Sequence, residues 1–294
     1  MSIDLEGLKT FVVVVESGSF AKASSRLHKV QSAISYQVRK LEKSVGSALF
    51  DRTHYRAELT HVGRYVYQEA CKLLRQVAQL SEASQQFRNG WEPNLSIVID
   101  GIMPMAPIMR ILKQLADQSV PTRIQVKVEF LAGVQYRFQQ EHADIMLVKA
   151  YHHFPNFLNQ QLKPIECLLT CYYQHPLAKM DVVSLFDLRQ YVELSVNDSS
   201  EQNQLFSDPY TFGGDRIFHL SDFNAKKQAL MQGLGFGWMP KYLIEEDLLS
   251  GLLKPVRYAK GEQYAFSPML VYREDRSLGK AGRIFVESVL QALG

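Results

Sequence analysis

The N-terminal part of the chain places apolar and polar positions at helical spacing. Four apolar residues recur at intervals of four, three and four, which predicts one buried helical stripe; they are Ile34, Val38, Leu41 and Val45. Two shorter amphipathic segments, residues 8–15 and 20–27, precede this stripe. Gly18 followed by Ser19 is typical of a helix end and a new N-cap between them. The pattern predicts a small core of three helices.

The third predicted helix has a polar and basic outer face. Its outward positions are Ser32, Ser35, Tyr36, Arg39 and Lys43. Hydroxyl and guanidinium groups suit phosphate oxygens and base edges in a major groove, which is wide enough to admit a helix. Any three-helix bundle with a solvated face would show the same pattern, so the order of elements and the charge distribution have to separate the two interpretations.

Positive charge is concentrated in this part of the chain. Residues 18–64 contain nine Lys or Arg residues and three Asp or Glu residues, a net charge of +6, whereas the whole chain has a net charge of +3. The remaining residues therefore sum to −3. A basic end joined to a mildly acidic body predicts a DNA-binding module with a separate regulatory part.

A polar, arginine-bearing turn follows the three predicted helices. Leu49, Phe50 and Leu59 are apolar points on either side of it, which predicts a two-stranded wing within residues 47–63. Arg52 and Arg56 would then lie beside a duplex, on phosphate or in the minor groove. A solvated hairpin is the alternative.

Residues 61–87 lack proline and predict one long helix. A seam with heptad spacing runs along it, made of Val66, Ala70, Leu73, Val77, Leu80, Ser84 and Phe87. Such a seam predicts a dimer, which would present two reading helices to half-sites about one duplex turn, ~34 Å, apart. Packing against the protein's own body is the alternative. The Asn-Gly-Trp-Glu-Pro segment at residues 89–93 then marks a linker.

The rest of the chain alternates strands and helices. Strands are expected at residues 95–100, 123–130 and 144–150, with helices at 105–118 and 133–143 between them, which predicts a parallel βαβαβ unit. A second such unit is expected from residue 165, through strands at 191–195 and 216–220 and a helix at 224–232. The fold class is therefore α/β, behind an N-terminal DNA-binding module and a long helix.

Ligands of open α/β sheets bind beyond the carboxyl ends of the strands, and this rule selects the candidate effector site. The glycines of the set permit close backbone approach, and the helix N-termini after them can hold an anion. Each residue has an ordinary loop or core role as its alternative. The candidates are Gly101, Ile102, Met103, Ala132, Gly133, Lys149, Ser195, Asn197 and Phe223.

Residues 1–93 resemble the winged helix-turn-helix and linker helix of the LysR-type transcriptional regulators. The family's Ala-x-x-Leu-His, Gln-x-Ala-hydrophobic-Ser and Gln-hydrophobic-x-x-Leu-Glu runs correspond to residues 24–28, 31–35 and 37–42, with Ser24 in place of the first run's Ala. Its Leu-Phe-x-Arg start and Leu-Thr-x-x-Gly end of the wing correspond to residues 49–52 and 59–63.

The chain also departs from the family pattern in the reading helix. Val30 and Ser32 stand where Ser and Pro are common, which removes the usual hydroxyl cap and leaves Ser32 as a substitute cap. Tyr36 stands where Arg is frequent, and we expect a changed operator preference. More loosely, residues 175–178 and 231–240 resemble the family's effector-binding region, which has two subdomains like those of periplasmic solute-binding proteins.

The resemblance implies a cytoplasmic regulator that is not an enzyme, with DNA, a small-molecule effector and its own copies as partners, and RNA polymerase as a further candidate. It implies a homodimer or a homotetramer built as a dimer of dimers. The domains would be residues 1–60, 61–90 and 91–294, the last divided into lobe I (91–163 and 267–294) and lobe II (164–266). The expected DNA-binding residues are Lys29, Gln31, Ser32, Ser35, Tyr36, Arg39, Lys40, Arg52 and Arg56.

Competing interpretations have weaker support. A bilobal solute-binding protein or metabolic enzyme would need an export signal or a catalytic grouping, and neither is recognisable. The glycines of residues 233–237 follow a helix and enter a strand, the reverse of a dinucleotide loop. No metal or other cofactor is expected. Cys167 and Cys171 leave a thiol-redox sensor open, although on one strand they would lie about 13 Å apart at ~3.3 Å per residue, too far for a disulfide.

Overall fold

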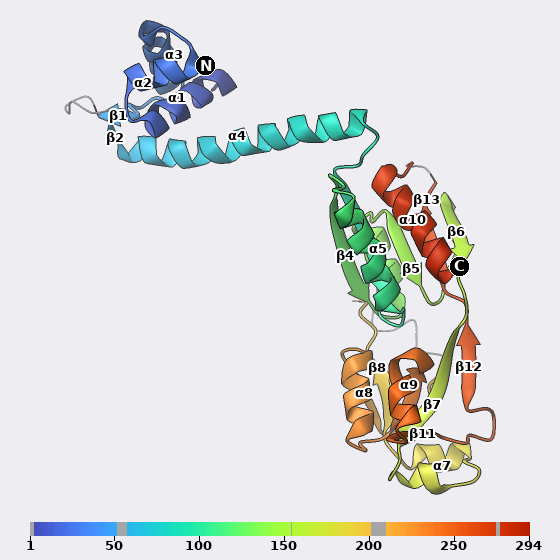
Figure 1. Cartoon of the computed structure of the whole chain (residues 1–294). Helices are drawn as coiled ribbons and strands as arrows, with labels where there is room; N and C mark the ends of the chain where they lie inside the picture. The colour runs from blue at the N-terminus through green and yellow to red at the C-terminus, as the bar shows by residue number, and fades with distance from the viewer. Residues whose placement is uncertain (1–2, 52–57, 154, 201–209, 275–276) are drawn as a thin grey trace. The chain divides into compact units, whose positions relative to one another are not determined.

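The computed structural model describes residues 3–51, 58–153, 155–200, 210–274 and 277–294. The chain divides into two compact units, Met1–Gln85 and Gln86–Gly294. Figure 1 shows the elements of each unit.

The first unit is built on the three predicted helices, which are α1 (Leu5–Ser17), α2 (Phe20–Leu27) and α3 (Gln31–Val45). Gly18 ends α1 in the left-handed conformation with φ 70°, and the Ser19 hydroxyl caps α2 by accepting a hydrogen bond from the Lys22 amide, as predicted. Phe11, Ile34 and Val38 are buried in the shared core. The predicted three-helix core is confirmed.

A short antiparallel pair and a long helix complete this part of the chain. Strands β1 (Phe50–Asp51) and β2 (Glu58–Leu59) pair as the predicted wing, and α4 (His61–Arg88) follows. Gly63, in the first turn of α4, lies against the wing: a Cβ there would come within 2.1 Å of the Leu49 carbonyl oxygen. That close approach requires glycine at the end of the Leu-Thr-x-x-Gly motif.

The second unit contains two sheets, and we call the part around the five-stranded sheet lobe I. Its strand order is β4-β3-β5-β13-β6. Strands β3 (Asn94–Asp100), β4 (Arg123–Glu129) and β5 (Ile145–Val148) are parallel, as predicted, whereas β6 (Phe157–Gln161) and β13 (Met269–Arg273) add antiparallel pairings.

Helices cover both faces of the lobe I sheet (Figure 1). Helices α5 (Met105–Asp117) and α10 (Lys280–Leu293) pack on the face that carries Ile97 and Ile99. Helix α6 (Ala132–Gln140) packs on the opposite face, against Val98. Burial on both faces explains why the central strands β3 and β5 are nearly continuous apolar runs, whereas the edge strand β4 alternates.

We call the part around the second sheet lobe II; its order is β11-β7-β10-β8-β9, with β12 also paired to β7. The strands are β7 (Ile165–Tyr172), β8 (Glu193–Val196), β9 (Ile217–Leu220), β10 (Phe236–Pro240), β11 (Leu253–Pro255) and β12 (Gln263–Phe266). The helices are the 3-10 helix η1 (Pro176–Lys179), α7 (Leu185–Arg189), α8 (Phe223–Met231) and α9 (Lys241–Leu249).

The prediction of a second parallel unit is only partly correct. Strands β8, β9 and β10 are parallel, but β7 runs antiparallel to β10, β11 and β12. A buried strand shows no alternation of polar and apolar residues, so its sequence does not indicate how its neighbours run. The partners of β7 also lie far along the chain. The glycines after α8 do form the predicted helix-to-strand turn, with Gly233 at φ 70°.

The chain passes between the lobes twice, in residues 162–164 and 267–268. A hydrogen bond joins the two crossings to each other: the Leu162 amide donates to the Pro268 carbonyl over 2.8 Å. Two adjacent crossings of this kind form a natural hinge.

Candidate functional sites

The outer face of α3 is exposed along the helix. Tyr36 is 68% exposed, and Gln31, Arg39 and Lys40 are also exposed, whereas Ser35 is half-buried. Arg39 makes no hydrogen bond or salt bridge with any other described residue. Its guanidinium is therefore available to a phosphate or to the edge of a guanine.

The start of α3 differs from the prediction. The helix begins at Gln31, so Ser32 lies inside the first turn and does not cap it. Val30 is the N-cap residue, with a 69% exposed side chain that cannot accept a hydrogen bond. The substitution of an apolar residue for the family's Ser thus leaves the first turn without a side-chain cap.

Two lysines of the predicted set are paired with acidic residues before or within α1. Lys40 Nζ lies 2.7 Å from Asp4 Oδ2, and Lys29 pairs with Glu6. The hydrogen bond from Lys40, followed by that from the Gly7 amide, lowers the pKa of Asp4. Both pairs are solvent-exposed, and such pairs are weak enough to exchange for phosphate.

The wing is anchored at its base to α3. The Glu42 carboxylate accepts hydrogen bonds from the amides of Leu49 (2.9 Å) and Phe50 (3.4 Å). The Thr60 hydroxyl donates to the Ala48 carbonyl over 2.8 Å. Arg52 and Arg56, the two predicted wing contacts, lie outside the described residues.

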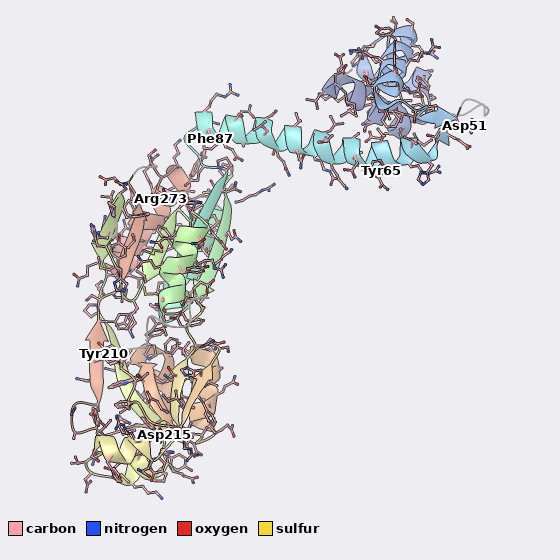
Figure 2. All side chains as sticks on the ribbon, turned by 180° about the vertical axis from the view of Figure 1, so that it is seen from behind. Asp51, Tyr65, Phe87, Tyr210, Asp215 and Arg273 are labelled. Carbon is pink, nitrogen blue, oxygen red and sulfur yellow. The ribbon has the colours of Figure 1, made fainter. Side chains whose placement is uncertain are left out.

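The predicted seam of α4 divides into two parts. Ala70 is buried and Val66 partly buried in the core of the first unit, so this part packs on the protein itself. By contrast, Leu73, Val77 and Leu80 are 47%, 39% and 68% exposed, and Phe87 is 60% exposed near the end of the helix (Figure 2). The second half of α4 therefore presents an apolar stripe without cover among the described residues.

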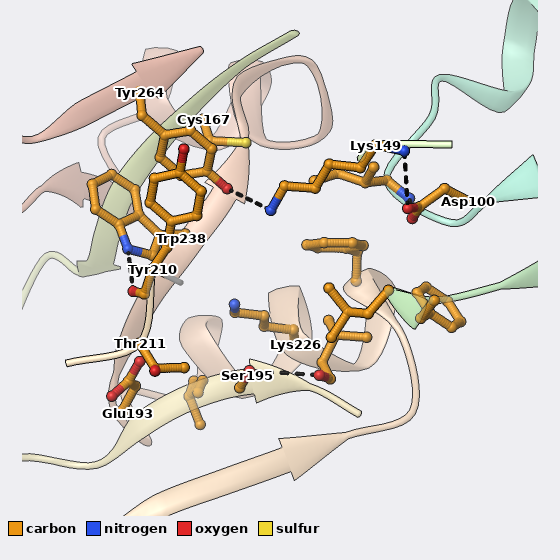
Figure 3. A pocket seen from close by; sticks show the side chains of 16 residues that line it. Asp100, Lys149, Cys167, Glu193, Ser195, Tyr210, Thr211, Lys226, Trp238 and Tyr264 are labelled. Atoms are coloured by element: carbon orange, nitrogen blue, oxygen red, sulfur yellow. Dashed lines mark hydrogen bonds between the residues drawn. The ribbon is translucent and has the colours of Figure 1, made fainter. Parts of the chain in front are cut away.

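A cavity of about 30 Å³ lies between the lobes (Figure 3). Lobe I contributes Asp100, Ile102, Phe130, Leu131 and Lys149. Lobe II contributes Cys167, Glu193, Leu194, Ser195, Val196, Tyr210, Thr211, Phe223, Lys226, Trp238 and Tyr264.

Aromatic rings form one wall of this cavity. Tyr210 and Tyr264 stack with ring centres 3.8 Å apart, and Trp238 meets Tyr264 edge-on at 4.9 Å. Lys149 extends from lobe I toward this wall (Figure 3): its Nζ lies 5.0 Å from the centre of the Tyr210 ring and donates to the Tyr264 hydroxyl over 3.3 Å. The wall can stack on a planar group, and the ammonium can attract an acidic one.

Charged groups of both signs are buried around the same cavity. Lys226 is 5% exposed, with its ammonium 5.8 Å from the centre of the Phe223 ring. The Asp100 carboxylate accepts a hydrogen bond from the Ile102 amide (3.1 Å), and that of Glu193 accepts one from the Phe212 amide (3.0 Å). Because the backbone orients both carboxylates, the cavity offers fixed acceptors together with two ammonium groups.

Two family models match the chain. A bacterial regulatory helix-turn-helix protein model of the lysR family matches residues 5–64, and the LysR substrate binding domain matches residues 88–294. The chain belongs to the LysR family. It is thus a DNA-binding transcriptional regulator with a separate effector-binding domain.

Related regulators match over most of their length. The chain is 29% identical to the probable HTH-type transcriptional regulator YhaJ of Escherichia coli, over 87% of this chain and 86% of that protein. It is 29% identical to the transcriptional activator AllS of Klebsiella pneumoniae, over 85% and 94%. A cysteine mutant of OxyR from Corynebacterium glutamicum shares the fold, with a TM-score of 0.73, 16% identity and coverage of 99% and 93%.

The structure brings four of the nine predicted effector residues to the cavity of this LysR-type regulator: Ile102, Lys149, Ser195 and Phe223. The other five do not line it. They are Gly101, Met103, Ala132, Gly133 and Asn197.

Three of these five have other positions in the fold. Met103 is 1% exposed in the lobe I core. Gly101 gives room to the Phe130 ring, which a Cβ there would approach to 2.1 Å. The Gly133 amide donates to Asp198.

The sequence prediction missed most residues of the cavity. Tyr210, Trp238 and Tyr264 come from three separate segments of lobe II, and local spacing gives no sign that they meet. Lys226 carries a signal of its own, because a lysine is almost never buried in a helix such as α8 unless its charge has a partner.

The cysteines of the regulator are free. Cys167 and Cys171 are buried on β7, and burial raises the pKa of Cys171 to about 12. A thiol with that pKa is almost entirely protonated at neutral pH, which argues against a redox role for Cys171. In the described part of the chain no helix is long and apolar enough to cross a membrane.

Proposed function

We propose that α3 is the reading helix of this regulator and that its outer face binds operator DNA. Arg39 carries the proposal, because it is exposed, has no partner among the described residues, and stands on a helix whose opposite face is fixed by the buried Ile34 and Val38. Gln31, Ser32, Ser35 and Tyr36 share the face, while Lys29 and Lys40 contact phosphate after exchanging their acidic partners. Arg52 and Arg56 of the wing complete the proposed interface.

The decisive experiment compares Arg39→Ala with the unaltered protein by fluorescence anisotropy on an operator obtained by selection. We expect an affinity loss of about tenfold to a hundredfold. The slope of log affinity against log salt concentration should become shallower by about 0.9 per protomer. Lys72→Ala is the matched control, since it removes one positive charge from α4, where Lys72 pairs with Glu69 at 2.8 Å. Unchanged binding by a folded Arg39→Ala protein would contradict the proposal.

The exposed stripe of α4 is proposed as the dimer contact. Its members, Leu73, Val77, Leu80 and Phe87, keep the heptad spacing after Ala70 turns into the protein's own core. The proposed domains are residues 1–60, 61–90 and 91–294, with lobe I formed by residues 91–163 and 267–294 and lobe II by residues 164–266. The strands of the two sheets support this division.

The cavity between the lobes is proposed as the effector site. Its aromatic wall and buried charges suit a small planar molecule with a charged or hydrogen-bonding substituent. LysG of Corynebacterium glutamicum, a structural neighbour with a TM-score of 0.54 and 17% identity, was solved with a bound effector, Arg, so a small charged molecule is a reasonable ligand class.

Thermal-shift measurements on the full chain test the effector site. Aromatic carboxylates, aromatic amines and aliphatic acids would be compared at equal concentration. We expect stabilisation by planar ligands that is lost in Lys149→Met and kept in Lys179→Met, which alters an exposed lysine of η1 outside the cavity lining. Equal shifts in both variants would contradict the assignment.

A further inference from the structure

A short segment of lobe II docks onto the start of α6 in lobe I. The Ser199 hydroxyl accepts a hydrogen bond from the Phe130 amide (2.8 Å) and lies 3.2 Å from the Phe130 carbonyl oxygen. The Asp198 carboxylate accepts from the amides of Gly133 (3.1 Å) and Ser200 (2.9 Å). The first turn of α6, expected from the sequence to hold a ligand's anion, is thus occupied by a carboxylate of the protein itself.

The backbone of lobe I is shaped around this contact. A Cβ on Gly133 would lie 2.0 Å from the Ser199 hydroxyl oxygen, so only glycine allows the approach. Leu131 has φ 54° and ψ −126°, an unusual conformation for a residue with a side chain. Strained residues of this kind persist where their surroundings hold them in place.

Two further contacts join the lobes around the cavity. The Tyr242 hydroxyl of α9 donates to the Ile102 carbonyl over 3.0 Å. Lys149 of lobe I reaches the aromatic wall of lobe II through the Tyr264 hydroxyl. The cavity lined by Lys149 and the aromatic wall measures about 30 Å³ and holds roughly one or two water molecules, whereas ligand pockets usually measure about 300–1,000 Å³.

We propose that Asp198 and Ser199 form a clasp that keeps the effector cleft closed in the unliganded regulator, and that effector entry requires its release. This inference rests on the proposed function only in taking the cavity as the effector site. Opening breaks the hydrogen bonds of the clasp together with those of Tyr242 and Lys149, and the lobes then rotate apart about residues 162–164 and 267–268. The energy spent on opening reduces the apparent affinity for an effector, because only the open fraction binds.

Acrylamide quenching of Trp238 tests the clasp without any effector. The chain has two tryptophans, so a Trp91→Phe background leaves Trp238, which lines the cavity, as the only fluorescent indole. In that background we compare Asp198→Asn/Ser199→Ala, which weakens the clasp from lobe II, with Gly133→Ala, which displaces Ser199 from lobe I. Asp181→Asn is the control, because the Asp181 side chain is 99% exposed and pairs only with Arg257 among the described residues.

We expect the Stern–Volmer constant of Trp238 to at least double in both clasp variants and to stay unchanged in the control. Unchanged quenching in folded clasp variants would overturn the proposal. If both variants fail to fold, hydrogen exchange on the unaltered regulator decides: a protected Phe130 amide is expected, and exchange at the rate of an open loop would overturn the clasp. A cleft that opens as expected but never binds a ligand would refute the effector site alone.

Discussion

Glu92 joins the linker that follows α4 to the start of α10, and its removal gives a calculable effect. The carboxylate is 9% exposed and accepts hydrogen bonds from the amides of Gly282 (2.6 Å) and Ala281 (3.1 Å). Gly279 makes room for it, since a Cβ there would lie 2.1 Å from Glu92 Oε2. A negative charge is thus held against the positive end of the α10 dipole.

Glu92→Ala removes two charge-assisted hydrogen bonds of about 1.5–3 kcal/mol each and leaves two buried amides without acceptors. We therefore expect the free energy of unfolding of the second unit to fall by about 3–6 kcal/mol. Glu92→Gln keeps one acceptor oxygen without the charge, and about half of that loss is expected.

Urea denaturation followed by circular dichroism measures the change. Glu287→Ala is the control on the same helix; Glu287 is exposed, so its effect should stay within about 0.5 kcal/mol. A loss below about 1 kcal/mol for Glu92→Ala would refute the reasoning, because it would mean that water replaces the carboxylate at little cost.

Three further outcomes follow from the structure. Leu80→Glu should lower the dimer fraction in analytical ultracentrifugation, because it places a charge in the exposed stripe of α4; the neighbouring Gln79→Glu should not, and equal effects would contradict the seam. In the native protein, Cys167 and Cys171 should resist a thiol reagent at pH 8 while the partly exposed Cys71 reacts, and three rapid reactions would contradict their burial. Burial lowers the pKa of His175 below its ordinary 6.5, so the unfolded chain takes up a proton first as the pH falls below 6.5, and the stability of the fold should decrease there. His175→Gln should make the decrease of the melting temperature with falling pH less steep. A dependence on pH as steep as that of the unaltered protein would contradict this reasoning.

The fold of the first unit is predicted mainly by local sequence signals. Gly18 and Ser19 end one helix and begin the next through contacts within one turn, and the apolar stripe of α3 is visible over the twelve positions of residues 34–45. The three parallel strands of lobe I are also predicted by local patterns, since β3 and β5 are short apolar runs, β4 alternates, and helices follow β3 and β4. Local capping and periodicity need no knowledge of distant residues, which is why these predictions are confirmed.

Only the tertiary structure decided three features: the direction of β7, the burial of Ala70 in the core of the first unit, and the set of residues that line the cavity. An apolar position predicts burial, but not whether it faces the protein's own core, as Ala70 does, or remains exposed, as Leu80 does. The cavity joins Lys149, Lys226 and Tyr264 across more than a hundred positions of sequence. Such contacts arise when two lobes close on each other, so their free energy depends on three-dimensional proximity that no local pattern contains. By itself the sequence determined the helices of the first unit and predicted which of them faces DNA, while the packing of the lobes determined which side chains surround the cavity between them.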